Sequence, residues 1–120
     1  MKGGKLKAHI LEEDVVEEIT LRLWMQYRIK VWRVRERIPG VGALSTPGLP
    51  DLMGWVRTTW LYARPLFIEC KRPGGARRAA QILFIDEARQ DGCVAFFASC
   101  WGDVVREMDQ QGGIKLREAV

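Results

Sequence analysis

Asp51, Glu69 and Lys71 are two carboxylates and an ammonium that two extended segments could bring together. Asp51 follows a proline and precedes apolar residues, so it opens a predicted strand. Glu69 and Lys71 flank Cys70 at the end of the next predicted strand. Because side chains alternate along a strand, Glu69 and Lys71 project to the same side, about 6–7 Å apart.

Pairing of these two strands would place Asp51 beside Glu69 near one end of a sheet. Two carboxylates at such a position repel each other and are costly to bury unless a cation lies between them. Oxygen ligands of this kind suit Mg²⁺ or Mn²⁺. A metal ion beside an ammonium can hydrolyse a phosphodiester, because the metal activates water while Lys71 orients the nucleophile or stabilises the transition state.

The Glu-x-Lys pattern is weak when it is taken alone, because such a pair on a strand is more often an exposed ion pair. The combination is far more specific. It joins Pro-Asp at the start of one strand to Ile-Glu-Cys-Lys at the end of the next. A basic glycine-rich loop and a helix that starts near Gln81 then follow.

Charge is distributed unevenly along the chain, whose formal net charge is +4. Residues 22–78 hold twelve Lys and Arg against three acids, a net charge of +9, whereas both flanking segments are net acidic. A solvated charged surface would explain this pattern equally well. The alternative is a positive face for a polyanion. Two of the three acids in this segment are Asp51 and Glu69, which favours the second interpretation.

Apolar periodicity predicts the elements that must position these residues. The expected order is helix, three strands, helix, strand, helix, which defines an α/β domain with a mixed sheet. The predicted ranges are a helix over 11–27, strands over 30–35, 52–57 and 66–70, a helix over 79–89, a strand over 93–98 and a helix over 102–109.

Further details follow from the same pattern. The strands at 52–57 and 66–70 are expected to be antiparallel neighbours joined around 62–65, and the segment 39–50 is expected to lack regular structure. The helix over 79–89 should bury Ile82, Ile85 and Ala88 and end at Gly92, which suits a C-terminal cap. We expect one domain over residues 1–120, because this length supports a single core.

Several classes of protein are excluded by composition. No apolar run approaches the roughly 20 residues that span a bilayer, and no apolar stretch follows the basic N-terminus as in a signal peptide. The three cysteines lack Cys-x-x-Cys spacing and are typical of reduced residues in a cytoplasmic protein. His9 is the only histidine, which argues against catalysis or metal binding by histidine.

Taken together, these motifs resemble the virus-type replication-repair nuclease family, a branch of the PD-(D/E)XK nuclease superfamily with a restriction-endonuclease-like core. The matching residues are Gly48-Leu49-Pro50-Asp51-Leu52, Phe67-Ile68-Glu69-Cys70-Lys71, Gln81 and Gly92. The resemblance implies that Asp51, Glu69 and the backbone carbonyl of Cys70 bind the metal. It also implies that Lys71 is catalytic and that Gln81 supports the site.

Members of this family carry a further glutamate on the first helix, and four residues here are candidates: Glu12, Glu13, Glu17 and Glu18. The family places an apolar residue three positions later, so Val15 favours Glu12 and Val16 favours Glu13. We take Glu13 as the expected residue. The chain departs from the family at Arg77-Arg78, where a Leu-Ser pair is usual, and at Cys70, where another apolar residue is usual.

The activity that the resemblance implies is Mg²⁺-dependent cleavage of DNA by a viral or phage endonuclease, with branched DNA or a four-way junction as substrate. One alternative is a nucleic-acid-binding module without catalysis, and another is a nuclease for linear ends or RNA. No small-molecule cofactor or membrane is expected. The residues expected to contact phosphates are Arg33, Arg35, Arg37, Arg57, Arg72, Arg77 and Arg78.

The five tryptophans are many for a chain of this size. Most are expected to be core residues or subunit contacts, with base stacking as the less common alternative. A homodimer is expected, because symmetric cleavage of a four-way junction needs two active sites and twofold dimers are the commonest oligomers. The apolar segment Trp60-Leu61-Tyr62 is the predicted source of an interface.

Overall fold

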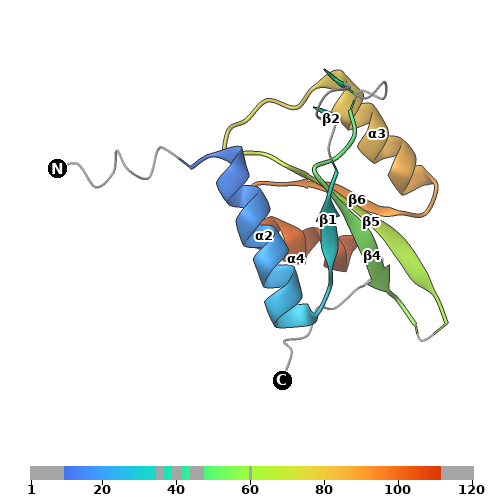
Figure 1. The fold of residues 1–120 in the computed structure, drawn as a ribbon. Coiled ribbons are helices and arrows are strands. Elements are labelled where there is room, and N and C mark those ends of the chain that lie inside the picture. Colours follow the sequence, from blue (N-terminus) through green and yellow to red (C-terminus); the bar gives the residue numbers. More distant parts are fainter. Residues whose placement is uncertain (1–9, 35–36, 39–41, 44–47, 60, 112–120) are drawn as a thin grey trace.

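A four-stranded mixed sheet with helices on both faces forms the body of the protein in the computed structural model, which describes residues 10–34, 37–38, 42–43, 48–59 and 61–111 (Figure 1). The strand order is β1, β4, β5, β6. The elements of this body are α2 (Glu12–Tyr27), β1 (Val31–Arg33), β4 (Leu52–Arg57), β5 (Ala63–Cys70), α3 (Ala79–Gln90), β6 (Val94–Ala98) and α4 (Trp101–Gln110).

The strand pairing confirms the predicted α/β architecture with a mixed sheet. β4 pairs antiparallel with both β1 and β5, whereas β5 and β6 are parallel. Helix α3 connects those two parallel neighbours. No helix in the described part of the chain combines the length and hydropathy needed to cross a bilayer.

Two apolar clusters hold the helices against opposite faces of the sheet. On one face, Ile19 of α2 and Met108 of α4 pack with residues such as Ile68 of β5. On the other face, Ile85 of α3 packs with Phe97 of β6. Side chains along β5 alternate between these two faces. Ile68 faces α2 and α4, so the residues on either side of it project toward α3.

Three local predictions differ from the structure. The segment 39–50 is predicted to be irregular, yet within it β3 (Gly42–Ala43) pairs antiparallel with β2 (Arg37–Ile38). Strand β5 starts at Ala63 rather than at residue 66 and includes Pro65, which precedes the stretch paired with β6 and so removes no hydrogen bond to it. Ile82 is exposed, because α3 contacts the sheet through Ile85 and Ala88.

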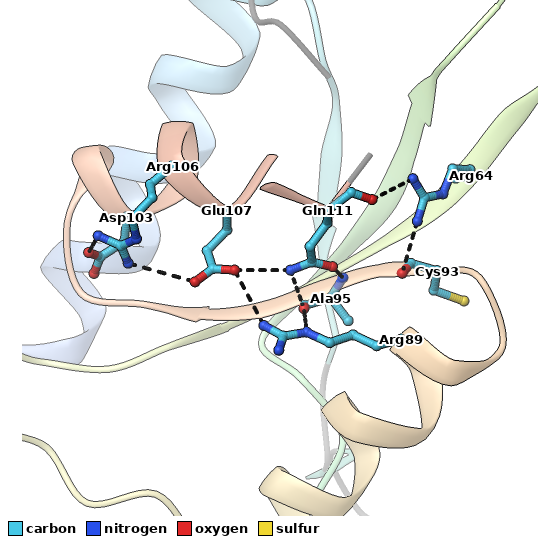
Figure 2. A network of polar contacts seen from close by, with 8 residues as sticks. All are labelled: Arg64, Arg89, Cys93, Ala95, Asp103, Arg106, Glu107 and Gln111. Carbon is cyan, nitrogen blue, oxygen red and sulfur yellow. Dashed lines mark hydrogen bonds and ion pairs between the residues drawn. The ribbon is translucent and has the colours of Figure 1, made fainter. Parts of the chain in front are cut away.

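Within the described residues, side chains rather than a further strand cover the outer edge of β6 (Figure 2). The amide of Gln111 donates a hydrogen bond to the carbonyl of Ala95 (2.8 Å) and accepts one from its N–H (2.9 Å). Nε of Arg89 donates to the same carbonyl at 2.6 Å, and the Arg89 guanidinium also pairs with Glu107. Because open strand edges recruit other strands, this network protects the edge from such pairing.

Candidate metal centre

The candidate site lies where β4 begins and β5 ends, at one end of the two central strands of the sheet. The register pairs Leu52 with Ile68 and so places Asp51 opposite Glu69. The Asp51 carboxylate accepts a hydrogen bond from the N–H of Cys70 (2.9 Å), and its backbone carbonyl accepts one from Val34 (2.8 Å). Asp51 is therefore held from both sides, by the predicted partner strand β5 and by Val34, which follows β1.

Gly48 fixes the approach of the chain to Asp51. Its φ is +82°, and a Cβ at this position would lie 2.4 Å from the carbonyl oxygen of Ala80 in the first turn of α3. A side chain is excluded by both conditions, so the segment before Asp51 can lie directly against α3 only because residue 48 is glycine. Pro50, which is buried, then leads the chain into the site.

Three carboxylates converge at this end of the sheet. Glu12, Asp51 and Glu69 each offer an oxygen, and these oxygens lie within 4.8 Å of one another. Glu69 is 3% exposed, whereas Glu12, the first residue of α2, is open to solvent. Nζ of the buried Lys71 lies 3.6 Å from Glu69 and 3.9 Å from Glu12. The predicted residues Asp51, Glu69 and Lys71 are thus brought together.

Gln81 reaches the same cluster from the first turn of α3. Its Nε2 donates a hydrogen bond to Oε2 of Glu69 at 3.0 Å, and its Oε1 accepts one from the N–H of Arg78 at 3.0 Å. The second bond caps the start of α3 through the side chain of Gln81. The family's usual serine would cap the same helix start, but with its own side chain as the acceptor. Gln81 therefore links the start of α3 to the buried carboxylate, in the position predicted for it.

The electrostatics of Glu69 favour a bound cation. Burial, followed by the neighbouring Asp51 carboxylate, raises the pKa of Glu69 from 4.5 to about 8, although Lys71 acts in the opposite direction. Among buried side-chain polar atoms of the described residues, Oε1 of Glu69 has no hydrogen-bond partner. A buried, unpaired carboxylate oxygen is costly, and a divalent cation would offset that cost. The ligand atoms that these described residues offer are all oxygens, which fit Mg²⁺ or Mn²⁺.

Cys70 can contribute only through its backbone. Burial raises the pKa of its thiol well above the ordinary range, and the nearby carboxylates add to this, so the sulfur stays protonated. The N–H and C=O of one residue in a strand point to the same edge, and the Cys70 N–H points to Asp51. The predicted ligand, the Cys70 carbonyl, is therefore expected on the same side as Asp51.

The helix glutamate in the cluster is Glu12 rather than the expected Glu13. Glu13 instead forms a two-bond ion pair with Arg33 of β1, which lowers the pKa of Glu13. The apolar residues three positions later could not separate the two, because Val15 and Val16 are both buried. Both glutamates lie in the first turn of α2, so no local signal in the sequence separates them.

The predicted phosphate-contacting arginines are dispersed. Arg72 and Arg78 line the same cleft as the carboxylates, whereas Arg33 is occupied by Glu13 on the α2 side of the sheet. Arg77 lies over the ring of Phe97 at 4.2 Å and lines a neighbouring cleft, and Arg57 is exposed on β4. Arg35 and the side chain of Arg37 lie outside the described residues.

The carboxylate cluster opens into a cleft of about 450 Å³. Lys71 and Gly75 line both this cleft and the neighbouring one, so the loop after β5 separates the two. The cleft that holds the carboxylates is lined by Glu12, Asp51, Glu69, Lys71, Arg72, Gly75, Ala76, Arg78 and Gln81.

Comparisons of the chain with protein-family models, curated proteins and solved structures found no match.

Proposed function

We propose that this protein is a metal-dependent endonuclease that hydrolyses DNA phosphodiester bonds. The observation that carries the proposal is the state of Glu69, a buried carboxylate with an unpartnered oxygen. Two further carboxylates lie within reach of it, and a buried lysine lies 3.6 Å away. A structural ion pair would need only one carboxylate for one lysine, whereas metal-assisted phosphoryl chemistry uses all four groups.

Glu12, Asp51 and Glu69 would hold Mg²⁺ or Mn²⁺, with the Cys70 carbonyl as a further ligand. When bound, the cation would lower the pKa of a water molecule and offset negative charge on the phosphate. Asp51 keeps its orientation through the N–H of Cys70. The Lys71 ammonium, held between Glu69 and Glu12, is placed to orient the nucleophile or to donate to a phosphate oxygen.

The surroundings of the cleft favour a polyanionic substrate. Arg72 and Arg78 are exposed and line the cleft together with the carboxylates. They belong to the segment 22–78, whose net charge is +9. Positive charge around a carboxylate cluster is useful for a phosphate backbone, because the arginines attract the polyanion that the carboxylates alone would repel.

Within this proposal the chain is a nuclease domain of the virus-type replication-repair branch of the PD-(D/E)XK superfamily. Its support is the motif pattern at residues 48–52 and 67–71, with the carboxylates at the ends of two central strands of a mixed sheet. The corresponding substrate is branched DNA or a four-way junction, cut by a homodimer. Leu61 and Tyr62, both exposed at the β4–β5 turn, offer an apolar surface for dimerisation, whereas Trp60 lies outside the described residues.

The oligomeric state can be tested by light scattering at micromolar concentration. A mass of twice 13.7 kDa is expected with and without a DNA junction. A mass of 13.7 kDa that a junction does not change would remove the dimer and, with it, paired incision. Cleavage itself would be unaffected by that result, because each chain carries its own complete cluster.

The activity can be tested with a panel of labelled DNAs. Duplex, single-stranded, flap and four-way-junction DNA and an RNA of the same sequence are incubated with the protein in Mg²⁺, Mn²⁺, Ca²⁺ or EDTA. We expect cleavage in Mg²⁺ and Mn²⁺, weak cleavage in Ca²⁺, whose looser coordination positions water poorly, and none in EDTA. Binding without cleavage in any metal would instead favour the nucleic-acid-binding module, and preferential cutting of RNA or linear ends would favour the third alternative.

A further inference from the structure

Three large apolar side chains lie exposed on the α3 face of the sheet. Trp32 of β1 is 41% exposed, and Met53 and Trp55 of β4 are 44% and 53% exposed. We call these three residues the aromatic platform. Surface hydrophobic residues are unremarkable when scattered singly, but a contiguous group of this kind marks a binding site.

The platform is a built arrangement. Trp32 is the register partner of Met53, and the rings of Trp32 and Trp55 lie 5.1 Å apart with a 32° tilt. Nζ of Lys30 lies 5.3 Å from the centre of the Trp32 ring. Two rings in contact and a cation above one of them form a surface that is apolar and positively charged at the same time.

The platform leads directly to the carboxylates. Side chains two residues apart on a strand share a face, so Asp51 lies in line with Met53 and Trp55, about 7 Å before Met53. Glu69 and Lys71 project to the same face from β5. Helix α3 covers the other half of this face, where Phe84 meets Phe67 edge-on at 5.2 Å. No helix in the described part of the chain covers the β1–β4 half.

We infer that the aromatic platform stacks unpaired bases of a DNA strand whose backbone enters the carboxylate cleft. The inference rests on the proposed nuclease function and adds a preference for substrates with a single-stranded segment beside the cut. Stacked aromatic rings with an adjacent cation are typical of sequence-tolerant binding of single strands. Continuity with the cleft that Arg72 and Arg78 line, and the position of Lys30, favour this occupant over a second copy of the chain, to which Lys30 would present an unpaired charge.

The experiment compares platform variants with a matched control. Trp32→Leu, Trp55→Leu and the double variant are measured against Trp24→Leu, because Trp24 is 49% exposed but lies on α2, under Arg28. Affinity for labelled oligo-dT and for duplex DNA is measured by fluorescence anisotropy over a range of salt concentrations, with Ca²⁺ in place of Mg²⁺. Trp55→Phe keeps a ring and serves as the conservative variant.

The double variant should bind oligo-dT about tenfold more weakly or worse, with duplex affinity changed less than about threefold. Its salt dependence should match that of the wild type, because stacking neutralises no phosphate. Trp24→Leu should bind as the wild type does, and Trp55→Phe should retain most of its affinity. Unchanged binding of oligo-dT by the double variant, or no binding by the wild type, would overturn the inference.

Two further outcomes separate this inference from its rivals. If light scattering finds a wild-type dimer and a monomeric double variant, the platform is a subunit interface and the inference fails. Duplex cleavage in Mg²⁺ reports on the proposed function independently. If the wild type cuts duplex DNA and the double variant keeps full affinity for oligo-dT, the nuclease function stands and the inference about the platform fails. If the double variant loses affinity for oligo-dT but the wild type cuts no DNA, the platform binds single strands and the proposed nuclease function fails.

Discussion

Gln81 donates a hydrogen bond from Nε2 to Oε2 of Glu69 over 3.0 Å while its Oε1 accepts the backbone N–H of Arg78. The second bond requires the amide oxygen to face the N–H of Arg78, so the amide nitrogen must face the carboxylate. The start of α3 and the orientation of Glu69 are therefore coupled through one side chain. In metal sites, groups that orient a ligand in this way affect metal affinity although they do not touch the metal.

Gln81→Leu should therefore weaken the metal site. The substitution removes the donor to Glu69, and we expect the Mg²⁺ concentration for half-maximal cleavage to rise about 10- to 100-fold. Gln90→Leu, at the exposed end of the same helix, is the matched control and should leave the Mg²⁺ requirement unchanged. Cleavage rates are measured over a Mg²⁺ titration. Equal Mg²⁺ requirements for Gln81→Leu and the wild type would show that Gln81 only caps the helix.

Glu12 and Glu13 are adjacent residues for which different effects are expected. Glu12→Gln should raise the Mg²⁺ requirement for cleavage about tenfold or more, because Glu12 supplies an oxygen to the cluster. Glu13→Gln should leave that requirement unchanged and lower the melting temperature slightly, because it removes an exposed ion pair with Arg33. Mg²⁺ titrations and thermal unfolding of both variants distinguish the roles, and a reversed pattern would restore Glu13 as the helix glutamate.

The raised pKa of Glu69 makes the stability of the metal-free protein depend on pH. The folded-state pKa of about 8 lies above the ordinary value of 4.5, so between these pH values the folded protein retains a proton that the unfolded chain has lost. Stability from this group is complete below pH 4.5 and declines as pH rises through about 8. Glu69→Gln cannot titrate and should show a flatter decline in melting temperature between about pH 5 and about pH 9 in EDTA.

Added Mg²⁺ should have the opposite effect on the wild type. A bound cation favours the charged form of Glu69, so the stabilisation by Mg²⁺ should grow with pH over the same interval. Glu69→Gln should gain much less from Mg²⁺ at the higher pH. Parallel pH profiles for the two proteins, with and without the metal, would mean that Glu69 titrates normally and is not the buried ligand proposed.

The sequence was sufficient for the two strand ends that carry the site. Apolar patterns predicted β4 and β6, and the spacing between Asp51 and Glu69 left only a short connection between their strands. Once those strands pair, the alternation of side chains places Lys71 beside Glu69. These features depend on local periodicity, which a single sequence records directly.

Features that depend on tertiary packing could not be predicted in the same way. Residues 63–65 join β5 because β4 offers a partner, despite Pro65. The tryptophans were expected mainly in the core or at subunit contacts, yet of the four that the structure describes only Trp101 packs against the core. Trp32 and Trp55 are exposed because α3 covers the β5–β6 half of its face, and the placement of a helix over a sheet leaves no local pattern.

The central claim is that one cluster cuts DNA while other residues bind it. Asp51→Asn preserves the shape of the side chain and can still accept the Cys70 N–H, but it removes a charge from the cluster. Lys71→Met preserves the length of the lysine but removes its ammonium. Both variants should remain folded and bind DNA within a few-fold of the wild type, because phosphate contacts elsewhere supply most of the affinity.

The most direct measurement is the single-turnover cleavage rate of these two variants on a four-way junction in Mg²⁺, with junction affinity measured on the same preparations. We predict a fall in rate of at least about 100-fold for each variant, at nearly unchanged affinity. Cleavage by Asp51→Asn and Lys71→Met at the wild-type rate, or robust wild-type cleavage in EDTA, would contradict the account.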